Sequence, residues 1–214
     1  MEKFLETTWS ILGGAQVTLQ IFLVTLFLSL PLGLLGAMAR LSKMRFVSRL
    51  MEFYIWIMRG SPLMLQLLFV YFALPLVGIR LDPVPSALLA FILNYAAYFA
   101  EIFRAGIQSI ERGQYEAAKA LGMTYMQTMR RIVLPQMIYR VLPPVSNETI
   151  NLVKDTSLIY ILAMNDLLRV ARTIVQRDFD MTAFFIAGVF YLFMTAVLTW
   201  IFKKLEAHCG RFDL

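Results

Sequence analysis

Polar side chains recur mostly at steps of three and four residues within the stretch from about Leu142 to Met164. They are Asn147, Glu148, Asn151 and Asp155. In a helix, this spacing puts the carboxylates and amides on one face. Such a face suits a polar solute, because carboxylates accept hydrogen bonds from an ammonium group and amides donate them to a carboxylate. It equally suits hydrogen bonds to a neighbouring helix, and the spacing alone leaves both interpretations open.

Two further polar residues interrupt apolar sequence and extend this set. Asn94 lies midway along an uncharged run, and Asp166 follows another apolar segment. The predicted solute path is formed by Asn94, Glu148, Asn151, Asp155 and Asp166. The single histidine, His208, gives no basis for a histidine-based metal site. The sequence also contains no Gly-x-x-x-x-Gly-Lys-Ser/Thr loop that would bind nucleotide phosphates, so we expect no cofactor on this chain.

The elements that must hold these residues are membrane spans. Apolar residues make up 59% of the 214 residues and charged residues 16%, whereas soluble domains have about 45–50% and about 25%. Four runs without any charge are each at least 18 residues long, about the length of a spanning helix; they cover 7–39, 60–79, 83–100 and 181–202. The first run is too long for a signal peptide and has an acidic lead-in.

The positions of basic residues predict the topology. Clusters that begin at Arg40, Arg104 and Lys203 follow the first, third and last runs, so these run ends are cytoplasmic. Because the third and last runs both end inside, another span must lie between Arg140 and Asp180. We therefore expect one all-α membrane domain over 1–214 with five spans, the N-terminus outside and the C-terminus cytoplasmic. The spans cover about 15–39, 54–78, 84–104, 136–164 and 181–203.

The fourth of these spans is the polar stretch, which cannot face lipid. It must be surrounded by other helices or line a wet cavity. Arg169, Arg172 and Arg177 would then lie outside, against the positive-inside rule. The alternative is a re-entrant or cytoplasmic segment in place of this span.

Small residues and breakers predict how the spans pack and bend. Gly33 and Ala37 in the first span, and Ala96 and Ala100 in the third, have the spacing that allows close helix packing. Gly60 and Pro62, in the sequence Arg-Gly-Ser-Pro, predict a kink or break in a helix. We interpret that tetrapeptide as a cytoplasmic cap in front of the second span. Glu101 and Arg104 are one turn apart and predict a helix ion pair.

A charged island over about 109–131 separates the third and fourth spans. Gly113 precedes and Gly122 ends its central piece, as expected for a short helix bounded by flexible residues. Tyr115, Ala118 and Leu121 give this helix an apolar side. Such a helix can lie on the lipid surface or fit a groove of a partner protein, and the pattern favours neither.

The island resembles the EAA loop of ATP-binding-cassette (ABC) importer permeases. Glu-Ala-Ala, three residues, Gly, nine residues and Ile-x-Leu-Pro match this pattern at Glu116, Ala117, Ala118, Gly122, Ile132, Leu134 and Pro135. Other stretches are similar to the polar amino-acid branch of these permeases, including Arg59–Leu63 and Leu152–Leu158. The similarity extends from about Val17 to Glu206.

This resemblance implies a non-catalytic permease subunit in a bacterial plasma (inner) membrane, transporting a polar amino acid. Two permease subunits, the same or homologous, pair in the lipid, and two ABC ATPase subunits carry ATP and Mg. A solute-binding protein delivers the amino acid from outside, and no nucleic acid is expected. The coupling helix that docks on the ATPase contains Glu116, Ala117, Ala118 and Gly122.

Two other functions remain open at this stage. A secondary transporter could use an ion gradient through Glu148, Lys154 and Asp155, although five spans show no obvious inverted repeat. A membrane scaffold could instead recruit a cytoplasmic partner through the charged island.

Overall fold

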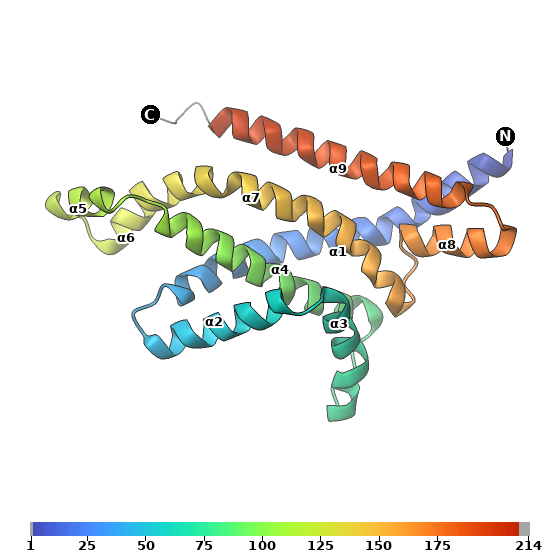
Figure 1. Ribbon diagram of the computed structural model, residues 1–214, viewed down its shortest axis with the longest axis horizontal. Coiled ribbons are helices and arrows are strands. Elements are labelled where there is room, and N and C mark those ends of the chain that lie inside the picture. The colour runs from blue at the N-terminus through green and yellow to red at the C-terminus, as the bar shows by residue number, and fades with distance from the viewer. Residues whose placement is uncertain (1, 210–214) are drawn as a thin grey trace.

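The computed structural model describes residues 2–209, which form helices joined by short turns, with no strand among them. Figure 1 shows the helices running mostly along one long axis. In chain order, the elements are α1 (Glu2–Arg40), α2 (Arg45–Gly60), α3 (Leu63–Leu68), the π-helical turn η1 (Phe69–Ala73), the 3₁₀ turn η2 (Leu74–Val77), α4 (Pro83–Gln108), α5 (Arg112–Ala120), α6 (Tyr125–Thr128), the π-helical turn η3 (Met129–Val133), α7 (Leu134–Asp155), the 3₁₀ segment η4 (Thr156–Leu162), α8 (Leu167–Asp178) and α9 (Thr182–Cys209).

The centre of the fold is the pair α1 and α4, which pack along much of their length. Small residues make this possible, as the sequence predicted: Ala37, Ala96 and Ala100 are buried. At Gly33, an added Cβ would lie only 2.5 Å from the Cβ of Phe99. The two backbones therefore approach closely, and the prediction that these small residues serve packing is confirmed.

The polar helix α7 lies against the centre of the fold rather than at its edge. It packs on α4 along one side and on α9 along another, and Val145, Thr149 and Leu152 are buried there. The helix α9 forms the outer edge of this part of the molecule (Figure 1). Surrounding helices therefore cover part of α7, as its polar sequence requires.

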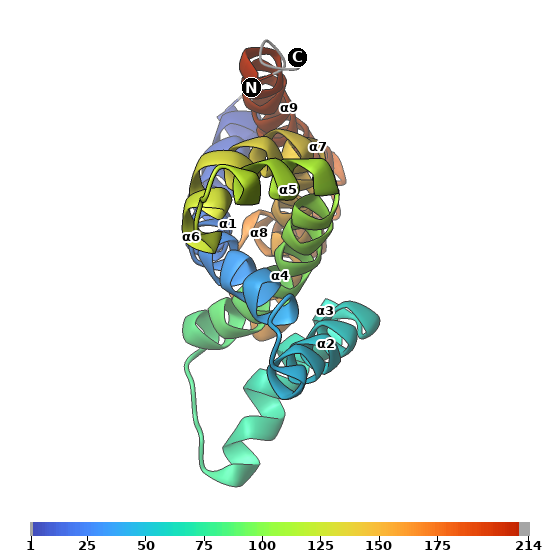
Figure 2. The ribbon, with the colours of Figure 1, turned by 90° about the vertical axis from the view of Figure 1, so that its left-hand side faces the viewer.

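The second predicted span is not one straight helix. Its first part, α2, begins at Arg45 and ends at Gly60, and the helical stretch Leu63–Val77 continues at an angle of 104° to it. Figure 2 shows this second part projecting as an arm from the bundle. The break predicted from Gly60 and Pro62 is confirmed. The tetrapeptide that we interpreted as a cap in front of the second span lies at the junction between α2, which begins at Arg45, and the stretch 63–77.

Three described helices are long and apolar enough to cross a membrane: α1, α4 and α9. The bent pair of α2 and the stretch 63–77 would make a fourth if it forms one span. The helix α7 is not among them. Its polar and proline residues give it a composition unlike that of a lipid-facing helix.

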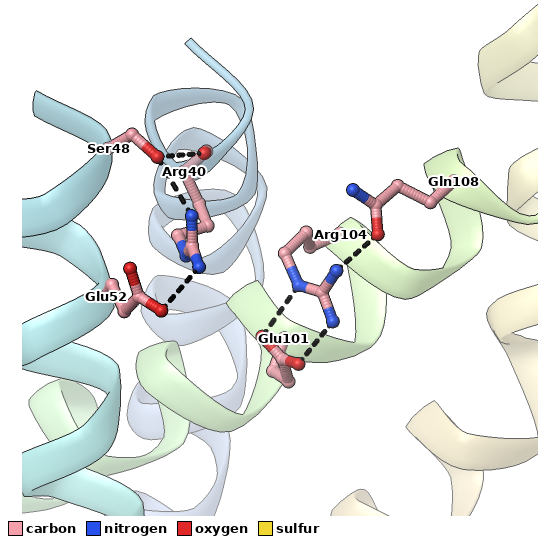
Figure 3. Close-up of polar contacts among 6 residues, drawn as sticks. All are labelled: Arg40, Ser48, Glu52, Glu101, Arg104 and Gln108. Carbon is pink, nitrogen blue, oxygen red and sulfur yellow. Dashed lines mark hydrogen bonds and ion pairs between the residues drawn. The ribbon is translucent and has the colours of Figure 1, made fainter. Parts of the chain in front are cut away.

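Polar contacts tie together the ends of α1 and α2 and brace α4 (Figure 3). Arg40 forms an ion pair of 2.8 Å with Glu52, and the Ser48 hydroxyl donates to the Arg40 carbonyl at 2.7 Å. Within α4, Arg104 pairs with Glu101 at 2.5 Å. The ion pair predicted from the one-turn spacing of Glu101 and Arg104 is confirmed.

The close approach at Gly33 gives a stability prediction. Gly33→Ala should destabilise the protein by about 1–3 kcal/mol, the usual cost of overpacking a tight contact. Gly13 lies in the same helix, and a Cβ added there would meet nothing within 4 Å. Gly13→Ala should therefore be neutral, or stabilising by about 0.5–1 kcal/mol through reduced backbone entropy. Thermal unfolding in detergent measures both, and equal effects would contradict the packing role of Gly33.

Candidate functional site

A polar cavity of about 620 Å³ lies where the α2–α3 break faces α4 and α7. Four of the five residues predicted for a solute path line it: Asn94, Glu148, Asn151 and Asp155. The other lining residues are Arg59, Gly60, Ser61, Pro62, Leu63, Met64, Tyr95, Tyr98 and Leu158. The cavity therefore gathers side chains from segments that are far apart in the sequence.

The α7 side of this cavity supplies its carboxylates. Glu148, Asn151 and Asp155 follow one another at steps of three and four, so the helix presents them on one face. The hydroxyl of Tyr95 on α4 donates a hydrogen bond of 2.7 Å to Asp155 Oδ2. This bond fixes one carboxylate oxygen of Asp155, and the side chains of Glu148 and Asn151 interact with each other on the same face.

The opposite side of the cavity comes from the broken helix and supplies a cation. The guanidinium carbon of Arg59 lies 5.3 Å from the ring centroid of Tyr98, within the range of a cation–π contact. Arg59 is exposed in the isolated chain, so its N–H donors remain accessible. The cavity thus places a guanidinium on one wall and two carboxylates on the other.

Asn94 lines the cavity, but its amide N–H groups are already used within the protein. They donate to the Met58 carbonyl at 2.9 Å and to Gln66 Oε1 at 3.0 Å. Sequence reasoning missed Gln66, whose amide bonds backbone carbonyls at the break between α2 and α3. The available signal was that Gln66 is the only amide side chain in the uncharged run 60–79.

Asp166, the fifth predicted residue, does not line this cavity. It is fully buried and caps α8, where its carboxylate accepts from the backbone N–H groups of Leu168 and Arg169, each at 3.1 Å. Burial raises the pKa of Asp166 to about 6, and the two N–H bonds oppose that rise. In this structure its contacts are those of a helix cap.

The EAA segment lies at the opposite end of the molecule from α8 (Figure 1). Glu116 and Ala117 are exposed on α5, whereas Ala118 is fully buried. The helix begins at Arg112 and so includes Gly113, which was expected to precede it. Exposed apolar side chains continue from its end, with Leu121, Tyr125 and Met126 all more than half exposed.

Gly122 ends α5 in a left-handed conformation with φ of 71°. The N–H of Met123 donates to the Ala118 carbonyl, and the N–H of Gly122 donates to the Lys119 carbonyl, each at 3.0 Å. These two bonds form a Schellman motif, which requires the left-handed residue. The prediction that this short helix ends at Gly122 is confirmed.

Several apolar helices around a polar cavity define a multi-pass membrane protein. The described part of the chain contains no group of three or more His, Cys, Asp or Glu side chains that could hold a metal ion. The family described as binding-protein-dependent transport system inner membrane component matches residues 29–210. The chain belongs to this family, whose members are the non-catalytic membrane permeases of ABC importers.

Individual relatives agree with this assignment. The probable amino-acid ABC transporter permease protein YckA of Bacillus subtilis (strain 168) is 40% identical over 202 residues, covering 92% of this chain and 89% of the relative. The glutamine transport system permease protein GlnP of Escherichia coli (strain K12) is 36% identical over 199 residues, covering 92% and 91%. The crystal structure of an amino acid ABC transporter with histidines contains a chain with a TM-score of 0.89 and 30% identity, covering 96% and 97%.

Proposed function

We propose that this permease forms the path by which a polar amino acid enters the cell, driven by ATP hydrolysis on partner subunits. The proposal rests mainly on the polar cavity between α2–α3, α4 and α7. Arg59 lines this cavity together with Glu148 and Asp155. An amino acid carries the complementary pair of groups, a carboxylate and an ammonium. Glu148, Asn151 and Asp155 contact the solute, and Asn94 shapes the wall beside it.

The proposed topology has five spans, with the N-terminus outside and the C-terminus cytoplasmic. The polar helix α7, with η4, forms the fourth span, and the bent α2–α3 pair forms the second. Asn147, Asn151 and Lys154 are exposed on α7 in the single chain. Polar groups at membrane depth need protein or water around them. A second permease subunit, the same or homologous, would cover this face and close the cavity.

The proposed coupling element is the EAA segment, with Glu116, Ala117, Ala118 and Gly122. Its exposed acidic and apolar side chains support docking into a groove of an ATPase. The complex contains two ATPase subunits, which hold ATP and Mg, and a solute-binding protein outside. Purified complex in proteoliposomes tests this proposal: uptake should require ATP inside, and uptake driven by a proton gradient without ATP would overturn it.

The Gly122 motif predicts a loss of coupling in one variant. Gly122→Val puts a β-branched side chain at φ of 71°, a backbone state that costs about 1–2 kcal/mol for an ordinary L-residue. The end of α5 should therefore rearrange, and the amount of amino acid transported per ATP hydrolysed should fall several-fold.

Gly113→Val provides the matched control, because Gly113 lies within α5 and an added Cβ meets nothing within 4 Å. Uptake and ATP hydrolysis are measured in the same proteoliposomes for both variants. Unchanged coupling in Gly122→Val would count against the coupling role of this turn.

The charges of the cavity favour a cationic amino acid. Its lining contains one guanidinium, Arg59, and two carboxylates, Glu148 and Asp155. A neutral amino acid neutralises one group of each sign and leaves one carboxylate with no cation among the lining residues, which is costly away from water. A cationic side chain supplies the missing partner. Lys154 is exposed on the neighbouring flank of α7 and does not line the cavity, but its charge acts on both Glu148 and Asp155.

A direct binding measurement checks this charge preference. The permease–ATPase complex in nanodiscs, without solute-binding protein, should bind L-arginine about tenfold more tightly than its neutral isostere L-citrulline. A difference of this size corresponds to one hydrogen bond to a charged group. Glu148→Gln should remove most of this difference. Glu52→Gln, which changes a carboxylate paired with Arg40 outside the cavity, should preserve it. Equal affinity for the two amino acids in the unmodified complex would refute the preference.

A further inference from the structure

The broken end of α2 leaves backbone carbonyls without partners from their own helix. A continuous helix would bond the Met58 carbonyl to an N–H one turn later, which at that position belongs to Pro62 and is absent. An unpaired carbonyl at membrane depth costs several kcal/mol. The protein must therefore satisfy Met58 O and Ser61 O with side chains.

A single side chain from beyond the break satisfies most of these groups. Gln66 Nε2 has two N–H donors and lies within hydrogen-bond distance of three acceptors: Met58 O at 2.9 Å, Ser61 O at 3.2 Å and Ser61 Oγ at 2.9 Å. Because Gln66 belongs to α3 and Met58 to α2, these bonds connect the two helices across the bend. They hold the arm at its angle to α2.

A second amide locks the first one to the centre of the fold. Asn94 of α4, only 3% exposed, donates to Met58 O at 2.9 Å and to Gln66 Oε1 at 3.0 Å. Met58 O thus accepts from both amides, and each amide fixes the other. The pair connects α2, α3 and α4 at one point.

The position of this pair affects the cavity directly. The break contributes six lining residues of the polar cavity: Arg59, Gly60, Ser61, Pro62, Leu63 and Met64. Behind it lies an apolar cavity of about 390 Å³, lined in part by Ile57, Leu65 and Phe69. A π-helical turn, a feature frequent at functional sites, follows α3 immediately.

We propose that Gln66 and Asn94 are positioning residues that form an amide latch, which holds the α2–α3 break in the orientation that shapes the polar cavity. The latch acts on the solute through the wall that it positions. The effect of the latch on transport rests on the proposed function. The angle of the bend can be measured without a transport assay.

The bend can be followed by the distance between spin labels on its two arms. Trp56→Cys on α2 and Leu76→Cys at the end of the arm are both highly exposed labelling sites, placed in a Cys209→Ser background in the full permease–ATPase complex. The latch is removed by Asn94→Leu and by Gln66→Met, which keep approximate size but lose the amides. Tyr54→Phe is the control, because it removes another bond between α2 and α4, from Tyr54 to the Leu93 carbonyl, without touching the break.

With the native latch, the distance distribution should be narrow. Each latch variant should broaden or shift it and lower ATP-driven uptake about tenfold, with Tyr54→Phe near the native values. The double variant should be no worse than either single variant, since both remove one unit.

An unchanged distribution in both latch variants would overturn the latch. A broadened distribution with native uptake would overturn its effect on the cavity, as would additive losses in the double variant. A complex with the native latch that shows no ATP-driven uptake would instead refute the proposed function, so the two failures are distinguishable.

Discussion

Polar groups at membrane depth need partners in the protein or in water, and this constraint shapes the fold. It explains why α7 packs between other helices, although its sequence is too polar for a lipid-facing span. It also explains why the broken helix α2–α3 carries its own amide donors. The ion pairs of Arg40 with Glu52 and of Glu101 with Arg104 satisfy the same requirement near the helix ends. Without these partners, the break and the polar helix would each oppose insertion into the membrane.

In the cavity, the polar and charged groups have only some of the partners that they could bind. Tyr95 satisfies one oxygen of Asp155, and the ring of Tyr98 lies beside Arg59, but the charged groups of the two walls retain capacity for further bonds. A solute with groups of both signs completes them. In the proposed function, these groups serve as the contacts for the transported solute. The EAA segment, for which we propose the coupling role, lies on α5 at one end of the molecule (Figure 1).

Sequence reasoning reached the polar face of α7 and the close packing at Gly33, because each depends on a local period or a small side chain. It also predicted that the short helix of the charged island ends at Gly122. It did not find the role of Gln66, because a lone amide in an apolar run has no periodic signal. It grouped Asp166 with the path, although tertiary contacts make that residue the cap of α8. It also missed the orientation of α2, because the residues that fix the bend come from α3 and α4.

The central claim is that the transported amino acid passes through the cavity beside Asn151. Its most direct test is solute protection of a cysteine at that position, with Asn151→Cys in a Cys209→Ser background of the complete transporter. A small, water-soluble thiol reagent should modify this cysteine, and a saturating concentration of the transported amino acid should slow the reaction several-fold. Ser48→Cys, outside the cavity, should show no protection. A modification rate at position 151 that does not change with solute, in a complex that still transports it, would contradict the account.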